Sequence, residues 1–447
     1  MKSFKKVLVL LPLLFLSALY VEAEVGETSN ELIYSIMIDR FNNSDPANDY
    51  QVDTANPNTY HGGDLDGVEK KLDYIKDMGF TTILLSSAFQ NGQGYEHNQS
   101  LDYFEIERHF GTKEDLKRLV DEAHKKELKI MIEFPGTDVH SPEELLDAAL
   151  MWINETGIDG YQLTKMNELP FEFWQEFYQE ISTVNEEFIF LAEPDKADVA
   201  QYESIGFTYL ANPGHNEKAA TILSAPDQAL DDLINTNDSQ IAKYVDNKDS
   251  IRFTRHSLQN KEHPVTRLKL ALSYLYLTPG VPVIYYGTEI VQDGGEPPTN
   301  SPLMNFRTDD ELEKYMTMLS KIRSGLPSIT KGVHEVLHQT EDGMVVIKAS
   351  YDENIDLIVI NNSTKTQKVT IDAAELAEDK QVRGLIEDTV FVEQNGEYTI
   401  ILDREKAEVF HLEEPQGVNI PFVLALILIP GLMIGFFMIN RRKHRDS

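Results

Sequence analysis

Three runs of apolar and β-branched residues carry side chains with chemical potential at or just beyond their ends. The runs 188–193 and 129–134 contain the carboxylic acids Glu193 and Glu133, and Thr164 follows the run 160–163. A positioned carboxyl group can protonate a leaving group, whereas a threonine hydroxyl is a poor nucleophile without an adjacent base. These residues indicate acid–base chemistry if the fold brings their positions together.

An alternation of short strands and amphipathic helices from Glu31 to about Gly325 provides the elements for such a site. Strands are predicted at 32–40, 81–88, 129–134, 160–163, 188–193, 207–211, 251–256 and 281–287, with helices at 67–78, 113–126, 142–154, 171–181 and 265–277. Parallel neighbours need crossover connections, so the alternation predicts an α/β fold, either a (β/α)₈ TIM barrel or an open doubly wound sheet. In a barrel, the carboxyl ends of all strands share one face.

The pattern changes after Gly325, where short strands are separated by turn residues. We predict a barrel over 24–329 and a small antiparallel β domain over 330–412, followed by a linker at 413–419.

Both ends of the chain have membrane-related features. Lysines precede an apolar run from Val7 to Val21, which predicts a signal peptide over 1–23. Residues 420–439 are free of charge and predict a transmembrane helix, with a basic tail at 440–447. The positive tail predicts a single-pass cell-membrane protein with its tail in the cytoplasm and its folded part extracellular.

Composition narrows the classes of partner. The 447 residues carry a formal net charge of −34, from 74 acidic and 40 basic side chains. Such a surface repels phosphate backbones, so nucleic acid is not expected as a partner. The absence of cysteine from the sequence excludes disulfides and cysteine-ligated metals.

Six segments, in the same order along the chain, resemble the α-amylase family of glycoside hydrolases. They are Tyr34–Phe41, His61–Gly67, Gly79–Ser86, His109–His124, Gly157–Tyr161 and Thr278–Glu289. The resemblance implies a TIM barrel followed by a β-sandwich and relates the chain to hydrolases of α-glucans such as starch and maltooligosaccharides.

The resemblance also assigns positions in the site. Glu193 takes the place of the acid/base, while Thr164 occupies the nucleophile position and Gln162 replaces the arginine that orients the nucleophile. Hydrolysis with retention needs two carboxyl groups about 5 Å apart. Of the two required carboxyl groups, only that of Glu193 is therefore expected at the reaction centre.

We interpret 251–256 as the seventh strand. On this interpretation His256 is retained, and Ser257 replaces the aspartate that stabilises the transition state. Arg255 adds a positive charge where an oxocarbenium-like state would form, which is unfavourable. The substrate-binding candidates are His256, Gln162, Glu133 and Asp102.

The loop after the third strand also departs from the family. The Asn-His pair that commonly contributes to a structural calcium site is absent, so we expect that site to be lost and no cofactor to be needed. Only about 25 residues separate Phe134 from Asp159, so the family's usual inserted domain is missing.

Three hypotheses follow. The first is a pseudoenzyme that binds an α-glucan or oligosaccharide, or a protein partner. The second is an active hydrolase with a reassigned nucleophile, for which Glu133, Asp195 and Glu289 are candidates. The third is a structural subunit that assembles with a membrane protein.

Overall fold

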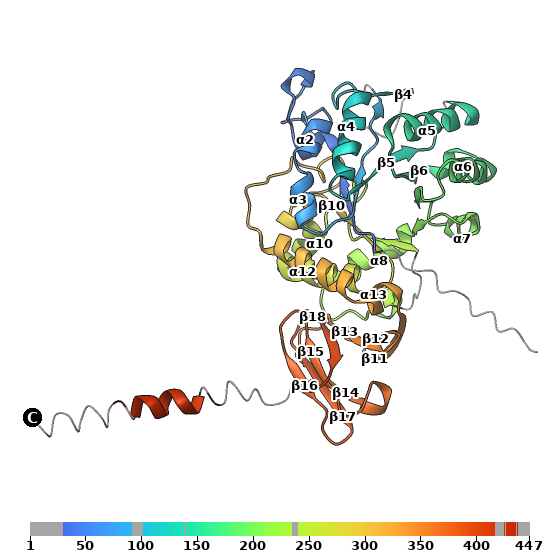
Figure 1. Cartoon of the computed structure of the whole chain (residues 1–447). Helices are drawn as coiled ribbons and strands as arrows, with labels where there is room; N and C mark the ends of the chain where they lie inside the picture. Colours follow the sequence, from blue (N-terminus) through green and yellow to red (C-terminus); the bar gives the residue numbers. More distant parts are fainter. Residues whose placement is uncertain are drawn as a thin grey trace, which may run out of the picture.

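The computed structural model describes residues 30–91, 102–137, 140–234, 240–415, 424, 426–434 and 436. The predicted signal peptide, 1–23, and the predicted tail, 440–447, lie outside the described residues. Within the described part, a barrel and a smaller all-β domain follow each other along the chain (Figure 1).

Eight parallel strands close into a barrel in the order β1-β10-β9-β8-β7-β6-β5-β2. They are β1 (Ile33–Ile36), β2 (Thr82–Leu85), β5 (Lys129–Pro135), β6 (Gly160–Thr164), β7 (Ile189–Ala192), β8 (Tyr209–Ala211), β9 (Ile241–Lys243) and β10 (Val281–Tyr285). Apolar side chains such as Ile33, Met131 and Leu191 fill the interior as one cluster. The barrel is therefore a packed core rather than a pore, and its chemistry lies at the strand ends. The prediction of a TIM barrel is confirmed.

Helices surround the strands and occupy most of the connections between them (Figure 1). Thr112 and Ser141 begin their helices with capping boxes, which satisfy amide groups that the first turn leaves unpaired. The helices are α1 (Ile38–Phe41), α2 (Leu65–Glu69), α3 (Leu72–Asp77), α4 (Lys113–His124), α5 (Pro142–Thr156), α6 (Phe171–Val184), α7 (Val199–Tyr202), α8 (Pro213–Leu223), α9 (Asp231–Ile234), α10 (Phe253–Gln259), α11 (Pro264–Leu277), α12 (Glu311–Gly325) and α13 (Pro327–Lys331).

The seventh strand lies earlier in the sequence than predicted. Residues 251–256 run into helix α10, and the barrel is completed by β9, which pairs with β8 on one side and β10 on the other. The apolar residues Ile251 and Phe253 suggested a strand, but they lie at the start of α10, where Phe253 is fully buried. Periodicity cannot separate a short buried strand from a buried helical turn, and β9 is only three residues long.

The C-terminal domain is antiparallel, as predicted. A six-stranded sheet has the order β11-β12-β13-β18-β15-β16, and β14 pairs with β17. Residues from both sheets, including Val346, Val359 and Ile400, share one core, which makes a small sandwich. The strands are β11 (Val333–Gln339), β12 (Met344–Tyr351), β13 (Asn354–Asn361), β14 (Gln367–Asp372), β15 (Gln381–Gly384), β16 (Val390–Val392), β17 (Glu397–Leu402) and β18 (Lys406–Glu413), and a further hairpin in the barrel domain pairs β3 (Phe89–Gln90) with β4 (Asp102–Ile106).

Buried polar contacts join the two domains. The guanidinium of Arg267, on α11, donates to the carbonyls of Leu223 and Ala225 and to the side-chain oxygen of Asn362 in the C-terminal domain. It also pairs with Glu405 at 3.3 Å. Arg267 is fully buried, so this one side chain ties the base of the barrel to the sandwich.

The predicted transmembrane segment, 420–439, is described only in part. Residues 424, 426–434 and 436 are helical, and their apolar side chains are exposed. Across the described ranges, no helix reaches the length and apolar character needed to cross a membrane. The rest of the predicted span lies outside the described residues.

Candidate active site

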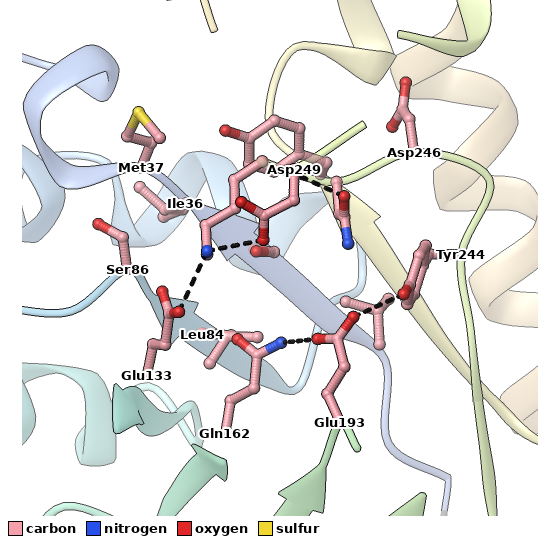
Figure 2. A pocket seen from close by; sticks show the side chains of 15 residues that line it. Ile36, Met37, Leu84, Ser86, Glu133, Gln162, Glu193, Tyr244, Asp246 and Asp249 are labelled. Atoms are coloured by element: carbon pink, nitrogen blue, oxygen red, sulfur yellow. Dashed lines mark hydrogen bonds and ion pairs between the residues drawn. The ribbon is translucent and has the colours of Figure 1, made fainter. Parts of the chain in front are cut away.

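The carboxyl ends of β1, β2, β5, β6, β7, β9 and β10 surround a small cavity of about 30 Å³. Figure 2 shows Glu133, Gln162 and Glu193 along one wall, each carried by a neighbouring strand. A water molecule needs roughly 10–15 Å³ of such volume, so the cavity has room for water but not for a sugar ring. Its lining residues are Ser35, Ile36, Met37, Leu84, Ser86, Glu133, Gln162, Glu193, Tyr244, Asp246, Asn247, Lys248, Asp249, Val283 and Tyr285.

Glu193 is held at the end of β7 from two sides. Its amide donates to the carbonyl of Leu163 on the adjacent strand at 2.8 Å. Its carboxyl oxygens accept from Gln162 Nε2 and from the Tyr244 hydroxyl, each at 2.7 Å. Burial raises the pKa of Glu193, and the hydrogen bond from Tyr244 opposes only part of that shift. A carboxyl group with a raised pKa keeps its proton to higher pH, as a general acid requires.

Lys248 lies between two other carboxylates. Its Nζ is 3.2 Å from Glu133 Oε1 and 2.7 Å from Asp249 Oδ2. Burial lowers the pKa of Lys248, but the carboxylates of Glu133 and Asp249 raise it by more, so it stands above its ordinary value. The ammonium therefore stays charged and neutralises much of the negative charge of the cavity.

Thr164, at the end of β6, donates its hydroxyl to Glu133 Oε1 at 2.9 Å. Gln162 and Thr164 are two residues apart, so both side chains lie on the same face of β6. Strand β6 thus supplies an amide and a hydroxyl to the site. Glu133 is buried, and its second oxygen, Oε2, has no hydrogen-bond partner among the described residues.

Several of the predicted site residues lie elsewhere. Ser257 is fully buried within α10 and donates its hydroxyl to the carbonyl of Phe253, so its prediction as a strand-end residue is wrong. Arg255 forms a paired contact with Asp293 on the exposed side of that helix, with both distances 2.7 Å. Asp102, in the hairpin strand β4, accepts from the amide of Phe104 and does not line the cavity.

His256 has an intermediate position. It does not line the small cavity, but it borders a second, larger cavity that adjoins Glu193. The prediction that His256 follows the seventh strand is wrong, because the residue belongs to α10. Hydrogen bonds do connect Gln162 with Glu193 and Thr164 with Glu133 at the strand ends.

Three site residues were not predicted from the sequence: Tyr244, Lys248 and Asp249, which all follow β9. Family members end the seventh strand with a carboxylate or small residue and then Asn-His-Asp. The segment Asp246-Asn247-Lys248-Asp249 fits that pattern with a single change, lysine for histidine. This signal was present in the sequence, but the incorrect position assigned to the seventh strand concealed it.

Comparisons with known proteins agree with this geometry. Models of the α-amylase catalytic domain and of the α-amylase C-terminal domain match residues 35–135 and 332–410. A solved Anoxybacillus α-amylase is 41% identical, with a TM-score of 0.82, and the match covers 87% of this chain and 99% of that one. This chain belongs to the α-amylase family.

Other members of the α-amylase family are also similar. An α-amylase from Geobacillus thermoleovorans, solved with acarbose, is 34% identical with a TM-score of 0.80, covering 87% of this chain and 99% of that one. A maltogenic α-amylase from Bacillus acidopullulyticus is 25% identical over 81% of this chain and 74% of its own length. A β/α-amylase from Paenibacillus polymyxa is 27% identical over 86% of this chain, which spans only 38% of that protein.

A structural metal site was expected to be lost. Within the ranges that the structure describes, no cluster of three or more His, Asp or Glu side chains is arranged to hold a metal ion. Asp138, the acidic residue of the loop after the third strand, lies outside the described residues.

Proposed function

We propose that this chain is an α-glucan-binding member of the α-amylase family in which hydrolysis is suppressed. The observation that carries the proposal is Thr164 at the nucleophile position, with its hydroxyl bonded to Glu133. Family hydrolysis with retention proceeds through a covalent bond between the sugar and a carboxylate. A threonine at that position cannot replace it, because its hydroxyl needs an activating base to attack.

The surroundings of Glu193 support the same proposal. The side-chain amide of Gln162, on β6, donates to the Glu193 carboxyl at 2.7 Å. In the family, the residue at this position, two before the nucleophile, is an arginine. The acid/base position is thus preserved without its partner. Loss of one member of a catalytic unit typically costs several powers of ten in rate.

Lys248 provides a second reason for weak hydrolysis. We assign Asp249 to the stabilising position of the family, which corrects the earlier assignment to Ser257. The Asp249 carboxylate is paired with Lys248 at 2.7 Å. An ammonium at this place opposes the positive charge of an oxocarbenium-like state, and it occupies space that a sugar ring would need.

Glucan binding is supported by the relatives and by the polar character of the barrel face. The Geobacillus thermoleovorans structure holds acarbose, and the Bacillus relative is named a maltogenic α-amylase. The larger cavity beside Glu193 is lined by carboxyl, amide and hydroxyl groups that can bond to sugar hydroxyls. The proposed ligand is therefore a maltooligosaccharide or a longer α-glucan.

We also propose that the protein is secreted and held at the cell membrane by residues 420–439. The support is the uncharged segment itself, followed by Arg441, Arg442, Lys443 and Arg445. The described helical part of the segment exposes large apolar side chains such as Leu426, Ile429 and Phe436. Anchoring of residues 420–439 in the membrane would also allow the chain to assemble with a membrane-protein partner.

One observation favours an alternative, an active hydrolase with Glu133 as the reassigned nucleophile. The hydrogen bond from Thr164 places the Glu133 carboxylate beside position 164, where the family has its nucleophilic carboxylate. Against this, the ion pair with Lys248 lowers the nucleophilicity of that carboxylate by binding the same oxygen, Oε1.

The proposal is tested with the full-length chain in a detergent that has no sugar headgroup. We expect maltoheptaose to bind in calorimetry, while its turnover equals that of the Glu193→Gln variant. Turnover that falls at least about a hundredfold in Glu193→Gln would contradict suppressed hydrolysis. Absence of binding to any α-glucan would contradict the glucan-binding role.

A further inference from the structure

Two buried basic side chains lie beside the turn that joins α11 to β10. Lys243, at the end of β9, donates to the carbonyl of Thr278 at 3.0 Å and to its hydroxyl at 2.6 Å. Arg323, on α12, donates to the carbonyls of Tyr276 and Gly280 at 2.7 and 2.9 Å. Both basic side chains are fully buried. One turn of the backbone thus holds both head groups.

The positive charges of Lys243 and Arg323 are not balanced by acidic side chains in the described parts of the chain. Neither residue forms an ion pair there, and no carboxylate is among the causes that shift their pKa values. Burial lowers the pKa of Lys243, and the nearby charge of Arg323 lowers it further. Burial also lowers the pKa of Arg323 to about 10, so the guanidinium remains charged at neutral pH. A buried charge is therefore left without an acidic partner among these residues.

The backbone offsets only part of this positive charge. The carbonyls of Tyr274, Tyr276 and Thr278, which accept from the two basic groups, lie at the carboxyl-terminal end of α11. Such a helix end carries roughly half a negative elementary charge. Two buried cations exceed that amount, and a buried charge without a counterion is costly. The surroundings of the turn therefore favour an additional negative charge.

Two buried nitrogen atoms beside this charge have no hydrogen-bond partner among the described residues. One is Nε of Arg323, and the other is Nε2 of His334, on the first strand of the sandwich, β11. Burial lowers the pKa of His334 to about 4, and the nearby charges of Lys243 and Arg323 contribute to the shift. The Nε of arginine always carries a hydrogen atom, and Nε2 of histidine carries one in the charged imidazole and in one neutral tautomer. Both atoms can therefore donate to an anion.

The number of free donors limits the kind of anion. The guanidinium of Arg323 already gives Nη1 and Nη2 to backbone carbonyls. The other titratable groups that act on Arg323 are the phenols of Tyr209 and Tyr276, and burial raises the pKa of Tyr276, so that phenol stays uncharged. A phosphate group carries several strong acceptor oxygens, whereas a halide ion is a single small acceptor. Positive charge with few free donors therefore indicates a halide.

We propose that Lys243, Arg323 and His334 hold one chloride ion at the joint between the barrel and the sandwich. The ion accepts hydrogen bonds from Arg323 Nε and His334 Nε2 and offsets the charge that Lys243 and Arg323 bury. It connects three elements, since β9, α12 and β11 each supply one residue. The site is independent of the proposed glucan binding, because none of its three residues lines the cavities beside Glu193.

Thermal unfolding of the full-length chain in detergent tests the site, with chloride replacing the larger anion isethionate at constant ionic strength. We expect chloride to raise the Tm in a saturable manner, because an ion that binds only the folded state stabilises it by mass action. His334→Leu removes one donor and should weaken the chloride Kd from this titration at least about tenfold. His338→Leu is the matched control, because His338 is also half-buried on β11 and is not among the groups that act on Lys243 or Arg323. It should leave the chloride Kd unchanged.

Bromide locates the ion directly. Crystals of the full-length chain in bromide should give an anomalous difference peak within contact distance of Arg323 Nε and His334 Nε2, and this measurement does not depend on the folding of any variant. A water molecule at that place, with no anomalous signal, would overturn the proposal. So would a Tm that responds equally to chloride and isethionate, or a chloride response that His334→Leu and His338→Leu change to the same extent.

Discussion

The ammonium of Lys248 lies 3.2 Å from the carboxylate of Glu133, and this contact joins the ends of β5 and the β9–α10 segment across the mouth of the barrel. The same ammonium reaches Asp249 at 2.7 Å. One lysine thus pairs with two carboxylates in a site where the family uses carboxylates for bond cleavage. Removal of its ammonium should affect both the stability of the fold and the access to the small cavity.

Lys248→Met should destabilise the fold and open the small cavity. The change leaves Glu133, which is 1% exposed, as an uncompensated buried charge. Removal of one partner from a buried pair typically costs about 3–5 kcal/mol. We expect a lower free energy of unfolding in denaturant titrations. The control Lys125→Met removes an exposed pair with Glu122 and should have little effect; equal effects of the two changes would show that the Lys248 contacts add nothing.

Restoration of the family residues should restore hydrolysis. The combined variant Thr164→Asp, Gln162→Arg and Lys248→His supplies the missing carboxylate, its arginine and the histidine before Asp249. The match to the solved Anoxybacillus α-amylase covers 99% of that chain. We expect maltoheptaose turnover to rise at least about a hundredfold over the starting protein. Adding Glu193→Gln should abolish the gain, and no gain at all would locate the impairment elsewhere.

Glu193 should make stability depend on pH in a defined direction. Burial raises its pKa in the folded state, so the folded state loses stability as the pH rises through that value. Glu193→Gln removes this loss. We expect its Tm to exceed that of the unmodified protein by about 2 °C at pH 8, with the difference shrinking as the pH falls through the raised pKa and absent below the ordinary glutamate pKa of roughly 4.3. Glu187→Gln, on an exposed turn, is the control, and a Tm difference that grows toward low pH would contradict the assignment.

Arg267 should be required for the barrel and the sandwich to unfold together. Its buried guanidinium bonds to Leu223, Ala225 and Asn362. Arg267→Met leaves these acceptors unpaired, so we expect a loss of about 3 kcal/mol or more. Differential scanning calorimetry should show a lower Tm, and a separate transition for the C-terminal domain would identify the joint as the weakened part. Lys269 lies on α11 like Arg267 and forms an exposed pair with Glu311 of α12, so Lys269→Met should leave the Tm near its starting value.

The fold could be predicted because the signals were local and repeated. Capping residues such as Thr112 and Ser141 mark helix starts, and the ordered family segments fix the barrel. The strand-end positions of Glu193, Glu133 and Thr164 followed directly from that frame. All three depend only on strand register, which alternation of side chains determines.

The seventh strand could not be predicted in the same way. Strand β9 has three residues and ends in Lys243. The Lys243 side chain is buried, and its ammonium donates to the carbonyl and the hydroxyl of Thr278. A buried lysine interrupts the apolar pattern by which a strand is recognised in a sequence. The residues at the start of α10, in contrast, resemble such a pattern. That error placed the stabilising residue at Ser257, whereas we propose Asp249. It also concealed Lys248, whose role depends on a three-dimensional contact with Glu133.

The most direct test of the central claim is covalent trapping of the nucleophile. The full-length chain is incubated with 5-fluoro-α-glucosyl fluoride, and intact mass spectrometry detects any glycosyl adduct. We expect no adduct on the unmodified protein and an adduct at position 164 once Thr164→Asp, Gln162→Arg and Lys248→His are introduced. A stoichiometric adduct on the unmodified protein, mapped to Glu133 or to any other carboxylate, would contradict the account.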